Sequence, residues 1–113
     1  MLPKENRLKK EKEIEGVFRR GKGFKEDFLI LKAVKNDLNE IRFGFIISGK
    51  VSKRATIRNK IKRRISSLVT LQMNKLKKGV DILLIALPGL EKKDFWEIEE
   101  VLNKLFKKAK IIE

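Results

Sequence analysis

The chain has 113 residues, of which 42% are hydrophobic and 39% are charged, and its formal net charge is +14 at pH 7. This length suits a single domain, residues 1–113, with one hydrophobic core. The chain contains no cysteine and no histidine. Their absence excludes disulfides and cysteine metal sites, and it removes the side chain most often used for acid–base catalysis near neutral pH.

The first part of the chain is predicted to hold an extended arm and a short helix. Residues 1–10 are polar and basic, and we interpret them as an arm from which Leu8 reaches the core; a frayed terminus is the alternative. Ile14, Val17 and Phe18 follow helical spacing, which predicts a helix over residues 10–20. This region lacks the apolar core of a secretory signal. The longest apolar run, residues 82–87, is too short to cross a bilayer, and we expect a cytoplasmic protein without membrane contact.

Two strands are predicted next, over residues 24–34 and 41–48, and we expect them to pair as an antiparallel hairpin. A short extra strand near residues 23–25 is an option. Alternation gives the second strand a bulky apolar face for the core and a thinner, accessible face made of Arg42, Gly44, Ile46 and Ser48. Gly44 either lets a partner approach the sheet closely or meets a packing need.

A long amphipathic helix is predicted over residues 56–76, with Ile57, Ile61, Ile65 and Leu68 on its apolar side. The stretch 49–64 carries eight basic residues and no acidic one, and residues 41–80 hold 12 of the 29 Lys and Arg but none of the 15 Asp and Glu. Cations in the first turns of a helix oppose its macrodipole. Their placement therefore favours a phosphate-bearing partner.

The last third of the chain is predicted to form a strand and a helix. Residues 80–87 are a continuous apolar run, typical of a strand buried on both faces. Asp94 and Glu97 have the spacing of a capping box, and an amphipathic helix follows to about Ala109. This order of elements predicts an α+β fold, a two-layer sandwich with helices against one mixed sheet.

The residue types disfavour catalysis by the protein itself. The basic segment holds no carboxylate, no Ser or Thr has a nearby base, and no glycine-rich phosphate loop occurs. The local positive field instead favours nucleic-acid binding. The sheet surface beside the basic helix, which we expect to include Leu29, Leu31, Ile46 and Ser48, suits single-stranded RNA better than a DNA groove.

At residues 58–63, the sequence Arg-Asn-Lys-Ile-Lys-Arg resembles the RNR-x-K-R signature of the bacterial ribonuclease P protein subunit. The resemblance extends through nearly the whole chain: it includes Asn6-Arg7-Leu8, Val17-Phe18 with Gly21, Arg42-x-Gly44 and Ser48-x-Lys50. Lys60 departs from the signature, because lysine keeps the charge but lacks the bidentate fork of arginine. Ile14 and Leu31 stand where aromatic residues are frequent, which weakens the expected stacking of bases.

The resemblance implies an αβββαβα order with an unusual left-handed βαβ crossover. It also implies that a catalytic RNA partner, and no residue of the protein, performs the Mg²⁺-dependent removal of the 5′ leader from precursor tRNA. The Mg²⁺ would be held mainly by the RNA, and no stable protein partner is implied. The implied RNA-binding residues are Lys50, Lys53, Arg54, Arg58, Asn59, Lys60, Lys62 and Arg63. The implied leader-binding cleft is formed by Phe18, Leu29, Leu31, Ile46 and Ser48.

Three other functions stay open at this point. The first is a ribosomal or other structural RNA-binding protein without a role in processing. The second is a protein nuclease, and the third is a DNA-binding regulator. Three tests distinguish them: stimulation of leader removal by a cognate RNA separates the ribonuclease P role from the first, turnover by the protein alone indicates the second, and preference for duplex DNA indicates the third.

Overall fold

A four-stranded mixed sheet forms the centre of the computed structural model, which describes residues 2–112. Its strands are β1 (Lys22–Glu26), β2 (Leu29–Lys35), β3 (Ile41–Ile47) and β4 (Val80–Ala86). The strand order is β1-β2-β4-β3, with β4 antiparallel to β2 and parallel to β3. The extra strand near residues 23–25 is confirmed as β1.

The predicted hairpin between the second and third strands is wrong, because β4 lies between β2 and β3. β2 forms its hairpin with β1 instead, through a tight turn in which Asp27 adopts a left-handed backbone conformation (φ 48°). β4 takes the central position since nearly all of its side chains are apolar, and a central strand is covered on both faces. The prediction of a buried interior strand over residues 80–87 is therefore confirmed.

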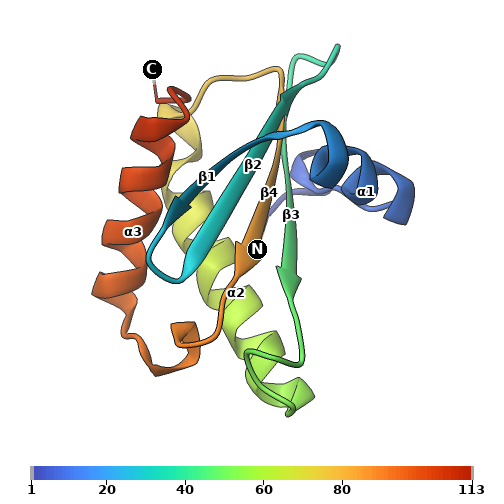
Figure 1. Ribbon diagram of the computed structural model, residues 1–113. Helices are drawn as coiled ribbons and strands as arrows, with labels where there is room; N and C mark the ends of the chain where they lie inside the picture. The colour runs from blue at the N-terminus through green and yellow to red at the C-terminus, as the bar shows by residue number, and fades with distance from the viewer. Residues whose placement is uncertain (1, 113) are drawn as a thin grey trace.

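Helices cover both faces of the sheet (Figure 1). The long helices are α1 (Glu11–Arg20), α2 (Ala55–Gln72) and α3 (Phe95–Lys108), and short 3₁₀ turns occupy η1 (Lys4–Asn6), η2 (Met73–Lys75) and η3 (Leu90–Lys92). α2 and α3 pack on one face and α1 crosses the other, so the connection from β3 through α2 to β4 is left-handed. The predicted fold class, element order and crossover are confirmed, as is the capping box formed by Asp94 and Glu97.

The register of the strands determines which side chains enter the main core. Leu29 and Leu31 lie opposite Ala86 and Leu84 of β4, and cross-strand partners share a face of the sheet. Both leucines are 0% exposed, in the core beneath α2 and α3. Their prediction as leader-cleft residues is wrong, because that cleft would lie on the opposite face.

The N-terminal arm is an ordered part of the fold, packed along the edge of β3. The backbone N–H of Leu8 donates to the carbonyl of Phe43 (2.9 Å), and the side-chain amide of Asn6 donates to the carbonyl of Ile41 (2.8 Å). Leu8 is buried with Val17 and Leu83 in a second, smaller cluster on the α1 side of the sheet. The prediction that Leu8 reaches the core is confirmed.

Gly44 meets a packing need. A Cβ atom at this position would lie 3.1 Å from Cδ1 of Leu8 and 3.3 Å from Cδ1 of Leu83. The arm thus occupies the space that the missing side chain leaves.

We expect Gly44→Val to destabilise the fold by about 1–3 kcal/mol, because the larger side chain forces Leu8 off the sheet. The free energy of unfolding in urea measures the effect. Gly49→Val is the matched control, since a Cβ at Gly49 has nothing within 4 Å, and we expect a change within about 0.5 kcal/mol. Valine favours strands more than glycine does, so a more stable Gly44→Val protein would contradict this packing.

Candidate nucleic-acid interface

The start of α2 concentrates cations that have no acidic partner. Its first turn contains no Asp or Glu, and the N-cap residue Arg54 makes no side-chain capping hydrogen bond. Among residues 2–112, none of the basic side chains between positions 50 and 64 forms an ion pair. Ile61, Ile65, Leu68 and Val69 are buried on the opposite side of the helix. The helix is therefore held by its apolar side and presents its charge to solvent.

A cleft of about 360 Å³ opens between the N-terminal arm, α1, β3 and the first turns of α2. Its polar lining residues are Arg7, Asn59, Lys62, Arg63 and Ser66, and its apolar ones are Leu2, Leu8, Ile14, Gly44 and Phe45. Among the residues that the structure describes, no carboxylate lines it. Cations around an apolar floor suit a nucleotide, whose phosphate pairs with the cations while its base covers the floor.

The structure brings only some of the predicted RNA-binding residues to this cleft. Asn59, Lys62 and Arg63 line it. Lys50, Lys53 and Arg54 are exposed on the loop before α2, and Lys60 is exposed on another side of the helix. Arg58 is half-buried, and its Nη1 donates to the carbonyl of Ser52 (2.8 Å). Arg58 therefore also holds the loop against the helix.

Beside this cleft, the α1 face of the sheet carries an apolar row that crosses three strands. Ile46 pairs with Ile85, and Ile85 pairs with Ile30, and all three are half-buried. Ile46 thus lies on the expected face. Ser48 is exposed just beyond the end of β3. We call the three isoleucines the isoleucine row.

Phe18 lies on α1 near this row and remains 48% exposed. Lys32 of β2 reaches it: the ammonium of Lys32 lies 4.2 Å from the centre of the Phe18 ring and donates to the Phe18 carbonyl (2.7 Å). Sequence reasoning missed Ile30, Lys32 and Ile85. The charge of Lys32 within an apolar strand was the available signal, because it marks the even positions of β2 as the accessible ones.

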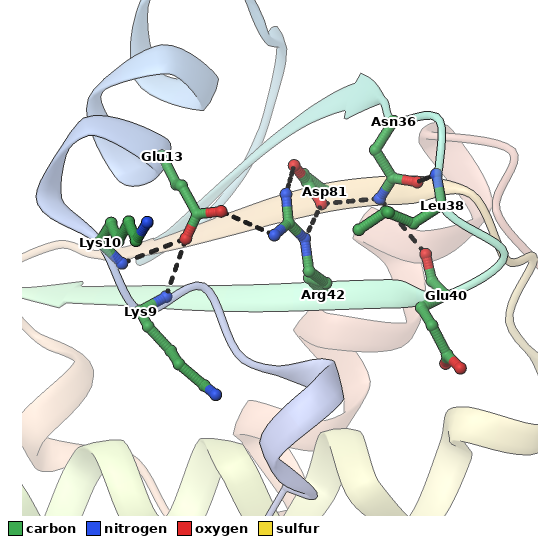
Figure 2. A network of polar contacts seen from close by, with 8 residues as sticks. All are labelled: Lys9, Lys10, Glu13, Asn36, Leu38, Glu40, Arg42 and Asp81. Atoms are coloured by element: carbon green, nitrogen blue, oxygen red, sulfur yellow. Dashed lines mark hydrogen bonds and ion pairs between the residues drawn. The ribbon is translucent and has the colours of Figure 1, made fainter.

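Arg42 was predicted on the accessible face, and the structure uses it to fasten α1 to the sheet (Figure 2). Its Nε and Nη2 donate to the two carboxylate oxygens of Asp81 (2.8 and 2.7 Å), and its Nη1 donates to Glu13 of α1 (2.7 Å). Glu13 also accepts from the backbone N–H groups of Lys10 (3.1 Å) and Lys9 (3.3 Å). This network sets the position of α1, which forms one wall of the cleft.

The same network shifts two pKa values. The hydrogen bond from the backbone of Lys10, followed by the contact with Arg42, holds the pKa of the Glu13 carboxyl below its ordinary value, although partial burial opposes this. The carboxylate of Asp81, helped by Glu13, raises the pKa of Arg42. Both groups are therefore charged at neutral pH.

Comparisons with known proteins agree with this geometry. A family model described as Ribonuclease P matches residues 2–110. The ribonuclease P protein component of Clostridium botulinum (strain 657) is 41% identical over 96% of this chain and 97% of its own length. The chain belongs to the ribonuclease P protein family. The component from Fusobacterium nucleatum is 36% identical, over 95% of this chain and 99% of its own length.

Solved structures of ribonuclease P proteins share the fold. The Staphylococcus aureus protein superposes with a TM-score of 0.87 over 96% of this chain and 98% of its own, at 24% identity. The Thermotoga maritima protein gives 0.82 over 90% and 96%, at 28% identity. As a ribonuclease P protein, the chain is the partner of the ribonuclease P RNA and a subunit of an endoribonuclease in which that RNA carries the catalysis.

Two features are absent from the part of the chain that the structure describes, residues 2–112. No helix there is both long enough and apolar enough to cross a membrane. Within the same residues, no three Asp or Glu side chains are grouped so that they could hold a metal ion.

We expect Glu13→Gln to lower the free energy of unfolding at pH 7 by about 0.5–1 kcal/mol, because the carboxylate that accepts from the Lys10 backbone and pairs with Arg42 loses its charge. The folded-state pKa of Glu13 is lowered, so its contribution is present above the ordinary carboxyl pKa and is lost as the pH falls through the folded-state value. Urea unfolding should therefore show a difference in the free energy of unfolding between the wild type and the variant at pH 7, and this difference should disappear at about pH 3.

Glu11→Gln is the control for this experiment. Glu11 occupies the same first turn of α1, is exposed, and makes no ion pair within the described residues. It shares the helix-dipole effect but not the contact with Arg42. If both variants lose the same free energy of unfolding at pH 7, Arg42 does not stabilise Glu13.

Proposed function

We propose that this ribonuclease P protein binds the ribonuclease P RNA through the loop before α2 and the first turns of that helix, and holds the 5′ leader of precursor tRNA on the α1 side of the sheet. The RNA then hydrolyses the bond between leader and tRNA. One observation carries the proposal: among residues 2–112, cations of α2 without an ion-pair partner border an apolar cleft that no carboxylate lines. We further propose that the complex acts in the cytoplasm.

The division of the surface into two parts supports these two roles. Lys50, Lys53, Arg54 and Lys60 project to solvent away from the cleft and suit the backbone of a folded RNA. Lys62 and Arg63 border the cleft itself. A strand that enters there meets cations on one side and the apolar side chains of the arm and β3 on the other.

The isoleucine row offers the leader an apolar path with little stacking. The one exposed aromatic ring nearby, Phe18, has the ammonium of Lys32 over it, so that face of the ring is not free to stack on a base. A leader on this surface is therefore held by phosphate contacts and by apolar contact with the isoleucines. Neither kind of contact distinguishes strongly between bases, and we propose weak base preference.

We assign the Mg²⁺ ions of the reaction to the RNA. The described residues offer no carboxylate cluster for a metal, whereas RNA phosphates are hard oxygen ligands of the kind that Mg²⁺ prefers. The protein contributes by neutralising phosphates, so that leader and catalytic RNA can approach one another.

We expect Lys62→Ala/Arg63→Ala to weaken binding of the ribonuclease P RNA without loss of folding, because both side chains are exposed. If the protein contacts five to eight phosphates, the slope of log affinity against log salt should be roughly −4 to −6 and should become less steep by about 1.5 in the variant. Filter binding at several salt concentrations measures the slope, and circular dichroism monitors the fold.

Two variants calibrate this measurement. Lys92→Ala removes an exposed lysine outside the site, and its slope should match the wild-type slope. Ile61→Asp buries a charge and shows the loss of helicity expected from unfolding. The proposal fails if Lys62→Ala/Arg63→Ala loses as much helicity as Ile61→Asp, or binds RNA as wild type does. Arg58 is less suitable because its truncation also frees the Ser52 loop.

Leader binding predicts a substrate-dependent defect for Ile30→Asp/Ile85→Asp, which places two carboxylates on the isoleucine row. In the reconstituted holoenzyme at low Mg²⁺, affinity for precursor tRNA should fall at least tenfold, because the new charges repel the leader phosphates. Affinity for mature tRNA, which has no leader, should stay within about twofold. Leu71→Asp is the control, since Leu71 is an exposed residue of α2.

If affinity falls equally for precursor tRNA and mature tRNA, the leader does not bind on the isoleucine row. Absence of any stimulation by the wild-type protein would instead favour a structural RNA-binding protein. Turnover of precursor tRNA by the protein without RNA would favour a protein nuclease, and we expect none.

A further inference from the structure

A second basic surface lies at the other end of the sandwich, outside the interface described above. Here the strands β1, β2 and β4 and the end of α3 surround a groove of about 350 Å³. Its lining includes the five lysines Lys22, Lys35, Lys77, Lys108 and Lys110, and no acidic residue among residues 2–112. Phe24, Val80 and Ile111 contribute to its apolar floor. We call it the lysine groove.

Four of these five lysines have no acidic partner among residues 2–112. Lys108 forms an ion pair with Glu26 and donates to the carbonyl of Lys25 (3.2 Å). Within residues 2–112, the side chains of the other four make no ion pair and no hydrogen bond, and all four are exposed. The ammonium of Lys22 lies over the ring of Phe24, 5.6 Å from its centre. Like charges that converge in this way repel one another unless an anion lies between them.

Helix ends explain only part of this cluster. Lysines near a helix C-terminus interact favourably with the macrodipole, which accounts for Lys108 in the last turn of α3 and for Lys110 just after it. It does not account for Lys22 and Lys35, which belong to strands β1 and β2. These two residues lie on the same face of the sheet, because Lys22 is opposite Ala33 and Lys35 is two residues further along.

The backbone holds the groove in a fixed shape. The N–H of Lys77 donates to the carbonyl of Ile111 (2.7 Å), and Leu76 bridges to Ile112. Lys110 has a left-handed backbone conformation (φ 56°) at the end of α3, where glycine is the favoured residue. The following residue, Ile111, is buried and fixes this turn. A cation therefore occupies a strained position that glycine would fill more easily.

The lysine groove is too far from the start of α2 to belong to the same contact. Lys77 follows the C-terminal end of α2, and the basic residues of the proposed RNA interface lie at its N-terminal end (Figure 1). The helix has 18 residues, so its ends are about 27 Å apart. A single phosphate group therefore cannot contact both ends of the helix.

We propose that the lysine groove is a second RNA-binding surface, which binds backbone phosphates of the partner RNA about 27 Å from the α2 interface. Charge complementarity selects RNA as the occupant, since the family's partner is a polyanion and the groove presents four cations that have no acidic partner within residues 2–112. Lysines act as point charges without fixed geometry, so the contact reads no sequence. Together with the α2 interface, it fixes the orientation of the protein on the RNA. The inference rests on the proposed RNA binding by α2 and adds a separate site to it.

The test uses Lys22→Gln/Lys35→Gln/Lys110→Gly in the full chain. Glycine at position 110 removes the charge and suits the left-handed conformation, so this substitution should not destabilise the fold. We expect affinity for the full-length catalytic RNA to fall about tenfold at moderate salt, and the salt slope to become less steep by about 2–3. Binding of a short single-stranded leader oligonucleotide should be unchanged, because it reaches only the α2 side.

The matched control is Lys92→Gln/Lys104→Gln/Lys107→Gln, which removes the same charge outside the groove. Equal losses in both triple variants would reduce the effect to net charge and overturn the proposal, as would wild-type affinity of the groove variant. If Lys62→Ala/Arg63→Ala also binds as wild type does, the proposed function has failed as well. If only the groove variant binds as wild type does, the second site alone has failed.

Cross-linking locates the contact directly. Because the chain has no cysteine, Lys35→Cys and Asn59→Cys each create a unique attachment point for a short photoactivated probe. The two probes should react with different segments of the RNA in the reconstituted complex. Reaction of the Lys35→Cys probe with a protein only, or with no RNA, would overturn the assignment.

Discussion

The burial of β4 on both faces is the constraint on which the rest of this structure depends. A strand that pairs on both edges and has apolar side chains on both faces must be covered twice. α2 and α3 provide one cover, and α1 with the N-terminal arm provides the other. Because β3 is parallel to β4, the chain must cross the sheet between them, and α2 makes that crossing. The basic first turns of α2 are thereby placed at the edge of the sheet along which the arm runs and where α1 begins.

The two groups of arginine and lysine on this side of the sheet have opposite roles. Arg42 is neutralised by Asp81 and Glu13, and its contribution is to hold α1 at a fixed distance from β3. The cations of α2 have no such partners, and the acidic residues of the chain lie elsewhere. A neutralised arginine builds the wall of the cleft, and unneutralised side chains supply its field. A protein that binds a polyanion needs both, because like charges on a helix that is not held in place would push one another apart.

Patterns local in sequence predicted most elements and missed how the strands associate. The helices, the buried strand and the packing of Leu8 follow from spacing within a few residues. The position of β4 between β2 and β3 depends on pairs of residues 39 to 57 positions apart in the sequence, which no local pattern contains. The start of β2 is apolar on both faces, so alternation there does not show which residues face the main core. The prediction therefore placed Leu29 and Leu31 on the wrong face. Arg42 was taken as accessible because its partner Asp81 is distant in the sequence.

The charge of α2 also links stability to binding. Cations beside the N–H groups of the first turn, without a capping side chain, make the RNA-free start of this helix less stable than its apolar side alone would allow. A phosphate bound there removes both the repulsion and the unfavourable dipole contact. Anything that binds the folded state and not the unfolded one adds to its stability in proportion to the logarithm of its concentration relative to Kd. The same cations that weaken the isolated protein are therefore those through which RNA stabilises it, and an acidic residue placed among them would strengthen the free fold at the expense of the complex.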